Sequence, residues 1–209
     1  MPAGEDSLAH RRHVCSRVIP QSRDSLTQQL DLEKIFGRKA PLHVDLGCGD
    51  GSFLCALAQR VPAKNFLGIE RLLGRIRSSA RKAASLDNVR LLQMESSYAV
   101  RYLLPAESVE TFYLLFPDPW PKRRHHRRRI VTQDFLNSAH TALKENGTLH
   151  IATDDLDYFG KIKGIAGLNS GFVMGDADHN LPPSKFGVIF RQKGAPIHWL
   201  ALRKISPVT

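Results

Sequence analysis

The residues best suited to chemistry lie between Phe116 and Arg129, where the chain reads FPDPWPKRRHHRRR. Asp118 stands there between Pro117 and Pro119, which restrict the backbone on both of its sides. The eight residues Lys122–Arg129 contain six Lys or Arg and two His. A fixed carboxylate beside so many cations favours chemistry on a polyanion, and a phosphate backbone is the natural one.

A glycine-rich segment, DLGCGDG, follows a short apolar run and is expected to form a strand-to-helix turn. Its glycines allow a tight turn and let a ligand lie against bare backbone. Glu70 ends the next expected strand, about twenty residues further along the chain. An acid at that position can accept hydrogen bonds from both ribose hydroxyls. Asp45 stands just ahead of the loop and suits a ligand with a cationic amino-acid part better than a pyrophosphate. We therefore expect S-adenosylmethionine, with a structural glycine turn as the alternative.

Two further residues bear on this ligand. Glu95 ends the third expected strand and would lie over the same crevice, where it accepts from the adenine amino group or is merely a surface acid. Ser52 stands where the nicotinamide fingerprint GxGxxG has its last glycine, which disfavours an oxidoreductase.

Strands and helices alternate over about 110 residues, which predicts an α/β fold with a parallel sheet covered on both faces. Asn146-Gly147 is expected to stop the helix that begins at Gln133, with glycine in the left-handed conformation. The expected strands are Leu42–Leu46, Asn65–Glu70, Asn88–Met94, Val109–Phe116, Thr148–Ala152, Val188–Arg191 and His198–Arg203. The expected helices are Phe53–Val61, Leu72–Leu86, Gln133–Leu143 and Tyr158–Ile165.

Composition bounds the class of protein. The 209 residues carry a formal net charge of +10, which favours a nucleic acid or another anionic partner. We expect a basic, partly disordered arm over residues 1–40, with a short helix over Ser25–Ile35, and one domain over residues 41–209. The first thirty residues lack the apolar core of a signal peptide, and no apolar run is long enough to span a membrane.

Cysteine and histidine give no sign of a metal site. The three cysteines form no CxxC pair and the nine histidines show no metal-ligand spacing, so we expect no metal and no disulfide framework. A reducing cytoplasm is the default location. The oligomeric state, monomer or homodimer, stays open.

Four segments in the same order resemble the bacterial tRNA (guanine-N7-)-methyltransferases: DLGCGDG, NFLGIE, LLFPDPWPKRRHHRRRIV and LHIATDD. The resemblance covers about residues 40–204. It implies a Rossmann-like class I methyltransferase fold, with a seven-stranded, mostly parallel sheet whose last strand is antiparallel. It also implies methyl transfer from S-adenosylmethionine to N7 of a guanosine in the variable loop of tRNA.

The resemblance also implies roles for individual residues. Asp45, Glu70 and Glu95 match cofactor-binding acids, Asp118 matches an acid bound up with catalysis, and Lys122 and Asp154 match substrate-binding positions. Ser184-Lys185-Phe186-Gly187 replaces a Thr-Lys-Phe-Glu-like segment of relatives, so the glutamate is lost. The full expected set is cofactor-binding Asp45, Gly47, Gly49, Gly51, Glu70 and Glu95, catalytic Asp118, and substrate-binding Lys122, Arg123, Arg124, Arg127, Arg128, Asp154, Ser184 and Lys185.

Alternatives remain for several features. The chain could be an RNA-binding protein with an inactive methyltransferase fold, or a methyltransferase for another RNA or a small molecule. We expect the cations of Lys122–Arg128 to bind phosphates rather than read bases, and Trp120 either stacks on a base or anchors the loop. Arg71, Arg75, Arg77, Arg81 and Lys82 are interpreted as a solvated helix face, with an extension of the cationic surface as the alternative.

Overall fold

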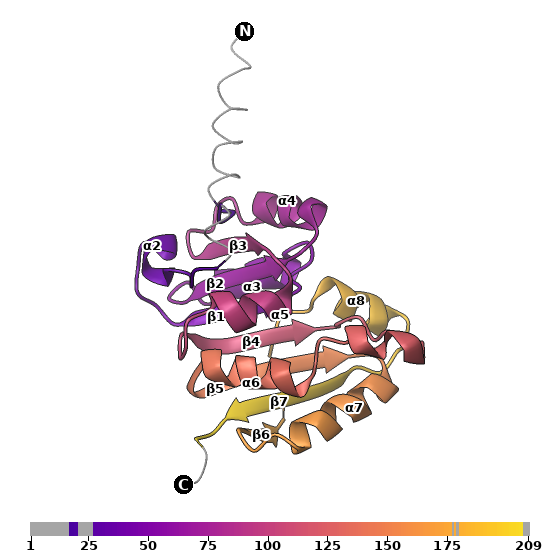
Figure 1. Ribbon diagram of the computed structural model, residues 1–209. Helices are drawn as coiled ribbons and strands as arrows, with labels where there is room; N and C mark the ends of the chain where they lie inside the picture. Colours follow the sequence, from indigo (N-terminus) through magenta and orange to yellow (C-terminus); the bar gives the residue numbers. More distant parts are fainter. Residues whose placement is uncertain (1–16, 21–26, 177, 179, 207–209) are drawn as a thin grey trace.

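Seven strands form one sheet in the computed structural model, which describes residues 17–20, 27–176, 178 and 180–206. The strand order is β3-β2-β1-β4-β5-β7-β6 (Figure 1). Strands β1 to β5 run parallel, and β7 is antiparallel to both β5 and β6. This confirms the predicted class I methyltransferase fold with its antiparallel last strand. The strands are β1 Leu42–Leu46, β2 Asn65–Glu70, β3 Val89–Gln93, β4 Val109–Leu115, β5 Leu143–Thr153, β6 Phe172–Gly175 and β7 His198–Lys204.

Helices cover both faces of the sheet and bury two separate apolar clusters. On one face, Phe53 and Ile76 from α3 and α4 pack with Phe66 of β2. On the other face, Phe135 of α6 and Tyr158 of α7 pack in the larger cluster. The helical segments are α2 Leu32–Phe36, α3 Ser52–Arg60, α4 Leu73–Lys82, α5 Ser96–Tyr98, η2 Ala99–Leu103, η3 Arg123–Arg128, α6 Gln133–Ala142, α7 Leu156–Gly167 and α8 Lys185–Gln192.

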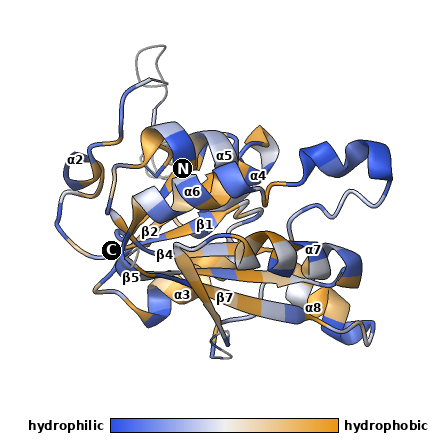
Figure 2. Cartoon of the chain, turned by 60° about the horizontal axis from the view of Figure 1, so that its bottom comes forward, coloured by the Kyte–Doolittle hydropathy of each residue, from blue (hydrophilic) through white to orange (hydrophobic). Residues whose placement is uncertain are grey.

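Among the strands, β1 and β2 are buried most completely. Every residue of β1 and of β2 is buried, as expected for parallel strands covered on both faces, and Figure 2 colours the sheet largely orange. A Cβ at Gly68 would lie 2.6 Å from Leu54 Cδ2 and 2.8 Å from Cys48 Sγ. Glycine in β2 therefore lets α3 and the loop before it pack directly on the strand.

One predicted strand is wrong, and one strand was not predicted. Val188–Arg191 is not a strand, because it lies within the helix α8. Ser184 caps this helix by accepting from the backbone N–H of Gly187 at 3.0 Å, and Gly194, with φ +66°, ends it. These two caps outweigh the strand preference of the Val-Ile-Phe run. Strand β6 was missed.

The segment around Asn146-Gly147 also differs from expectation, because α6 already ends at Ala142 and both residues lie within β5. Asn146 adopts the left-handed conformation, with φ 60°, whereas Gly147 does not. Gly147 is needed for another reason, because a Cβ there would lie 2.8 Å from the Lys144 carbonyl oxygen and 3.0 Å from that of Glu110. The glycine allows two backbones to approach each other closely.

The N-terminal segment contacts the sheet where it is described. Of the predicted helix Ser25–Ile35, Ser25 and Leu26 lie outside the described residues, and the helix in this region is α2, which begins after Asp31. Leu30 N–H donates to the Leu103 carbonyl at 2.8 Å, and Phe36 is buried in the larger core. The division into an arm of residues 1–40 and a domain of residues 41–209 stays a prediction.

Candidate functional site

The glycine loop joins β1 to α3 at the edge where the parallel strands end. Gly47, Gly49 and Gly51 all have positive φ, between 58° and 79°. The N–H groups of Gly47 and Cys48 both donate to the Ile69 carbonyl, at 2.8 and 3.0 Å, so the loop is tied to β2. The sequence LGCGDG thus forms the tight turn that was expected.

The three glycines face different surroundings. A Cβ at Gly47 would meet nothing within 4 Å, and one at Gly49 would come no closer than 3.9 Å to another atom. A Cβ at Gly51 would lie 2.9 Å from the Ser79 side chain on α4. Ser79 in turn donates to the Gly49 carbonyl at 2.9 Å. Two glycines therefore present bare backbone to open space, while the third allows the loop to pack on α4.

Two carboxylates lie beside this loop. Asp45 is the last residue but one of β1, Glu70 ends β2, and the two are only 3% and 4% exposed. Burial, and next the negative charge of Glu70, raise the pKa of Asp45 to about 8. Glu70 accepts from the Leu72 backbone N–H at 2.9 Å and lies 3.5 Å from Arg75. Asp45 has no hydrogen-bond partner among the described residues.

These groups fit S-adenosylmethionine. A buried carboxylate with a raised pKa is stabilised by a ligand that brings a positive charge, and this donor carries an ammonium and a sulfonium. Asp45 would hold the cationic part, Glu70 has capacity for ribose hydroxyls, and Gly47 and Gly49 leave room for the ligand against the backbone. These assignments stay predictions at the level of single residues.

Glu95 lies at the same edge, after β3, but is already engaged. It caps α5 by accepting from the backbone N–H groups of Ser97 at 3.0 Å and Tyr98 at 2.7 Å. Each carboxylate oxygen can accept a second hydrogen bond. A contact with adenine is compatible with this geometry and stays a prediction.

Asp118 follows β4 at the same edge and is held by its neighbours. Phe116 and Trp120, two residues away on each side, both have positive φ, 57° and 43°. Such conformations are costly for large side chains, on the order of 1–3 kcal/mol each, and persist only where the surroundings impose them. The Phe116 N–H donates to the Ala152 carbonyl at 2.7 Å. The Asp118 side chain is exposed and has no partner among the described residues.

Trp120 is packed within its own motif. The guanidinium of Arg128 lies 4.9 Å from its ring centroid, and the His125 ring meets it edge-on at 5.7 Å. Of the two alternatives for Trp120, anchoring the loop is the one supported by these contacts.

Arg129 is a structural anchor that sequence reasoning missed. Its side chain is buried, although it ends a run of cations. Its Nε donates to the Pro119 carbonyl at 2.6 Å, its Nη2 lies 3.2 Å from Asp157, and its guanidinium lies 4.7 Å from the Tyr158 ring centroid. Arg129 therefore fixes the segment around Asp118 to the start of α7. Only the apolar pair Ile130-Val131 that follows it hinted at burial.

The remaining cations form an exposed surface. Residues 123–128 form the short helix η3, which is strongly hydrophilic (Figure 2). His126 lies 3.4 Å from the Pro121 carbonyl and 3.5 Å from Lys161. Asp154 follows β5, the strand beside β4, and is half-buried. Exposed side chains at this site are Lys122, Arg123, Arg124, Arg127 and Arg128.

Ser184 and Lys185 lie at the start of α8, where Ser184 serves as its cap. Ser184 and Gly187 line a small pocket together with Phe116, so α8 lies beside the Asp118 segment. The pocket also contains Arg191 and Trp199, which sequence reasoning did not single out. Lys185 is exposed.

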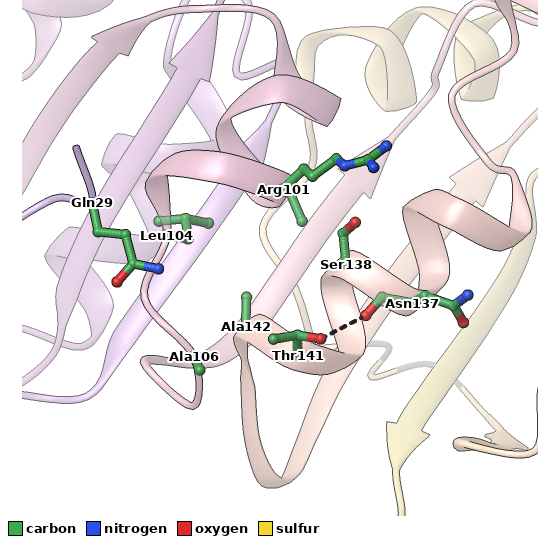
Figure 3. A pocket seen from close by; sticks show the side chains of 9 residues that line it. Gln29, Arg101, Leu104, Ala106, Asn137, Ser138, Thr141 and Ala142 are labelled. Carbon is green, nitrogen blue, oxygen red and sulfur yellow. Dashed lines mark hydrogen bonds between the residues drawn. The ribbon is translucent and has the colours of Figure 1, made fainter. Parts of the chain in front are cut away.

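A second cavity, of about 220 Å³, lies between η2 and α6 and is not part of this edge. Figure 3 shows Gln29 and Leu104 on one side of it and Thr141 on the other, with Thr141 donating to the Asn137 carbonyl at 3.1 Å. Among the described residues, no three His, Cys, Asp or Glu side chains are grouped so as to hold a metal ion. None of the described helices is both long and apolar enough to cross a membrane.

Comparison with solved structures supports the fold. The chain matches an antibiotic-related methyltransferase with a TM-score of 0.61 at 19% identity, covering 91% of this chain and 98% of the other. It also matches an rRNA methylase from Streptococcus thermophilus with a TM-score of 0.54 at 11% identity, covering 99% of both chains. At such low identity these likenesses show the fold alone.

Comparison with known sequences shows the family. A family model described as putative methyltransferase matches residues 39–193. The chain is 39% identical over 182 residues to the tRNA (guanine-N(7)-)-methyltransferase of Thermotoga maritima, covering 85% of this chain but only 58% of that relative. It is 34% identical to the same enzyme of Nitrosomonas europaea, covering 83% of this chain and 79% of the relative. The chain therefore belongs to the tRNA (guanine-N(7)-)-methyltransferase family.

Proposed function

We propose that this protein transfers a methyl group from S-adenosylmethionine to N7 of a guanosine in the variable loop of tRNA, giving 7-methylguanosine. One arrangement carries the proposal. The buried acids near the ends of β1 and β2 lie at the same edge of the sheet as the Asp118 segment and the cationic helix η3, which follow the neighbouring strand β4. A donor and a polyanionic acceptor can meet there.

The reaction requires no proton transfer by the protein. When bound, S-adenosylmethionine supplies an electrophilic methyl group on sulfur. Guanine N7 has an in-plane lone pair and no proton, so its attack forms the N–C bond while the S–C bond breaks and leaves its electron pair on sulfur. The base becomes cationic, and no general base is needed for the step. Positioning and electrostatics supply the acceleration.

Asp118 has the role of stabilising this developing charge. Its carboxylate can face the cationic base directly or accept from the N1 and N2 hydrogens of guanine. The positive-φ residues on either side restrict the backbone that carries the carboxylate, which limits its reorganisation during the reaction. His125 and His126 have no proton to move in this step, and their contacts with the motif suit a supporting role.

The exposed cations of η3 bind tRNA phosphates in this proposal. Their contribution falls as salt rises, with a slope of about −0.7 to −0.9 in log affinity per log salt for each phosphate contact. Asp154, Ser184 and Lys185 surround the same region and belong to the proposed tRNA site. We propose the cytoplasm as the place of this reaction.

The direct test is to incubate the purified protein with unmodified tRNA and donor carrying a labelled methyl group. Digestion to nucleosides should give labelled 7-methylguanosine, mapped to the variable loop. Label in another nucleoside would move the reaction to a different atom, and tRNA binding without label would favour an inactive RNA-binding protein.

A further inference from the structure

The helix α4 and the turn before it form a cationic segment remote from η3 in the sequence. Residues 71–82 contain five Lys or Arg and no acid. Their buried side chains are Ile76, Ser79 and Ala80, which pack toward the sheet, so the cations lie on the remaining sides of the helix. A cationic face of this kind is commonly only solvated. Whether its cations are paired with acids decides between a solvated helix face and an extension of the cationic surface.

Two of the five cations are paired with acids in or beside the glycine loop. Arg75 lies 3.5 Å from Glu70. Lys82 lies 2.6 Å from Asp50 in the glycine loop and donates to Ser52 at 2.5 Å. These pairs occupy the side of α4 that faces the loop, and they have a structural role there.

The other three cations, Arg71, Arg77 and Arg81, are exposed and have no side-chain partner among the described residues. Arg77 and Arg81 are one helical turn apart, where like charges repel by a few tenths of a kcal/mol. A helix face that served solubility alone would gain from interleaved acids. Three unpaired guanidinium groups on α4 and the turn before it are instead complementary to a polyanion.

The position of α4 suits an RNA bound at η3. The turn with Arg71 follows β2, so it lies at the same edge of the sheet as Asp118, which follows β4 (Figure 1). Only β1 separates these two strands. With strands about 4.8 Å apart, β2 and β4 are about 10 Å apart at this edge. One RNA molecule can therefore contact both cationic segments across the crevice.

We propose that Arg71, Arg77 and Arg81 form a second RNA-binding surface that contacts tRNA phosphates outside the target loop. The proposal rests on the proposed function, since it takes tRNA as the polyanion. Guanidinium groups bind phosphates in a bidentate manner and carry no base specificity there. The surface therefore adds affinity and orients the tRNA, while recognition of the guanosine stays with the Asp118 site.

A variant that replaces the three arginines by uncharged side chains tests this surface: Arg71→Gln, Arg77→Gln and Arg81→Gln together. The matched control is Lys34→Gln, Lys39→Gln and Lys144→Gln, which removes the same charge from exposed side chains at the opposite edge. Affinity for unmodified tRNA is measured without donor over a range of KCl concentrations. The arginine variant should lower the salt slope by about one for each phosphate that the surface no longer binds, and the control should not.

Two further measurements complete the test. Donor affinity, measured by calorimetry, should be the same in the arginine variant and in the parent, which separates weaker RNA binding from damage to the donor site. Equal slopes in the variant, the control and the parent would overturn the proposal. So would a variant that keeps its tRNA affinity but no longer binds anionic lipid vesicles. Because binding is measured without donor, absence of 7-methylguanosine would refute the proposed function and not this surface.

Discussion

Among single residues, Asp118 is the one on which the proposed reaction depends most. It is an exposed carboxylate without a partner among the described residues, and its backbone is held between two positive-φ residues. Asp118→Asn keeps the shape and removes the charge. We expect kcat with tRNA to fall by about 10²–10³, the usual cost of one electrostatic contact in a transition state.

Single-turnover kinetics with saturating donor and tRNA would measure this loss directly. Donor affinity should stay unchanged, because Asp118 is not one of the acids beside the glycine loop. A variant with the turnover of the parent would remove the carboxylate from the mechanism.

Asp45 should make stability depend on pH. Its folded pKa is about 8, above the ordinary value of about 3.9, so the folded protein binds this proton more tightly than the unfolded chain. The resulting stability is fully present below about pH 4 and is lost as pH rises through about 8. In the unliganded protein, the free energy of unfolding should fall over this range by at most about 1.4 kcal/mol per pH unit.

Urea unfolding between pH 6.5 and 8.5 isolates this effect. Burial lowers the pKa of His43 to about 4, and His43 contributes a slope of opposite sign only below its unfolded value of about 6.5. Asp45→Asn should flatten the slope in that window. An unchanged slope would mean that Asp45 is ionised in the folded protein at neutral pH.

Arg129 should matter for stability more than its neighbour Arg128. Arg129→Met removes a partly buried hydrogen bond to the Pro119 carbonyl and the contact with Tyr158, and should lower the free energy of unfolding by about 1–3 kcal/mol. Arg128→Met, at an exposed position over Trp120, is the matched control and should cost less. Chemical denaturation measures both, and equal losses would argue against Arg129 as the anchor of the motif.

Among the structural elements, the glycine loop contains glycines with two different roles, packing on α4 and leaving space for the donor. Gly51→Ala meets both an unfavourable φ of 76° and the side chain of Ser79, so it should lower stability by more than the roughly 1–2 kcal/mol of a left-handed alanine. Gly47→Ala meets only the unfavourable φ, but it places a methyl group where the donor is expected.

Thermal unfolding and donor titration on both variants check this. Gly51→Ala should show the larger loss of stability. Gly47→Ala should show the larger loss of donor affinity relative to its stability. If the two variants behave alike, the open space beside Gly47 is not a ligand site.

The elements also show what the sequence could and could not predict. The buried runs of β1 and β2 and the turn between β1 and α3 were predictable, because full burial and left-handed backbone each demand particular residue types. The α8 segment was not, because Val188-Ile189-Phe190 favours a strand and the deciding caps, Ser184 and Gly194, act locally. Arg129 looked like one more surface cation, since only tertiary contacts bury it.

At the scale of the whole molecule, one edge of the sheet brings the two proposed ligands together. The acids beside the glycine loop lie near the ends of β1 and β2, and the Asp118 segment follows β4, so the donor and the target base approach each other across adjacent strands. Two cationic segments, η3 and α4, lie on either side of this crevice in the strand order. A net charge of +10 adds a general attraction for RNA that makes association depend on salt.

The most direct test uses the acceptor atom itself. Two tRNA transcripts are prepared, identical except that one carries 7-deazaguanosine, which has carbon in place of N7, at the guanosines of the variable loop. With donor and purified protein, the normal transcript should gain 7-methylguanosine and the substituted one should gain no methyl group. Equal methylation of both transcripts, or of neither, would contradict the account.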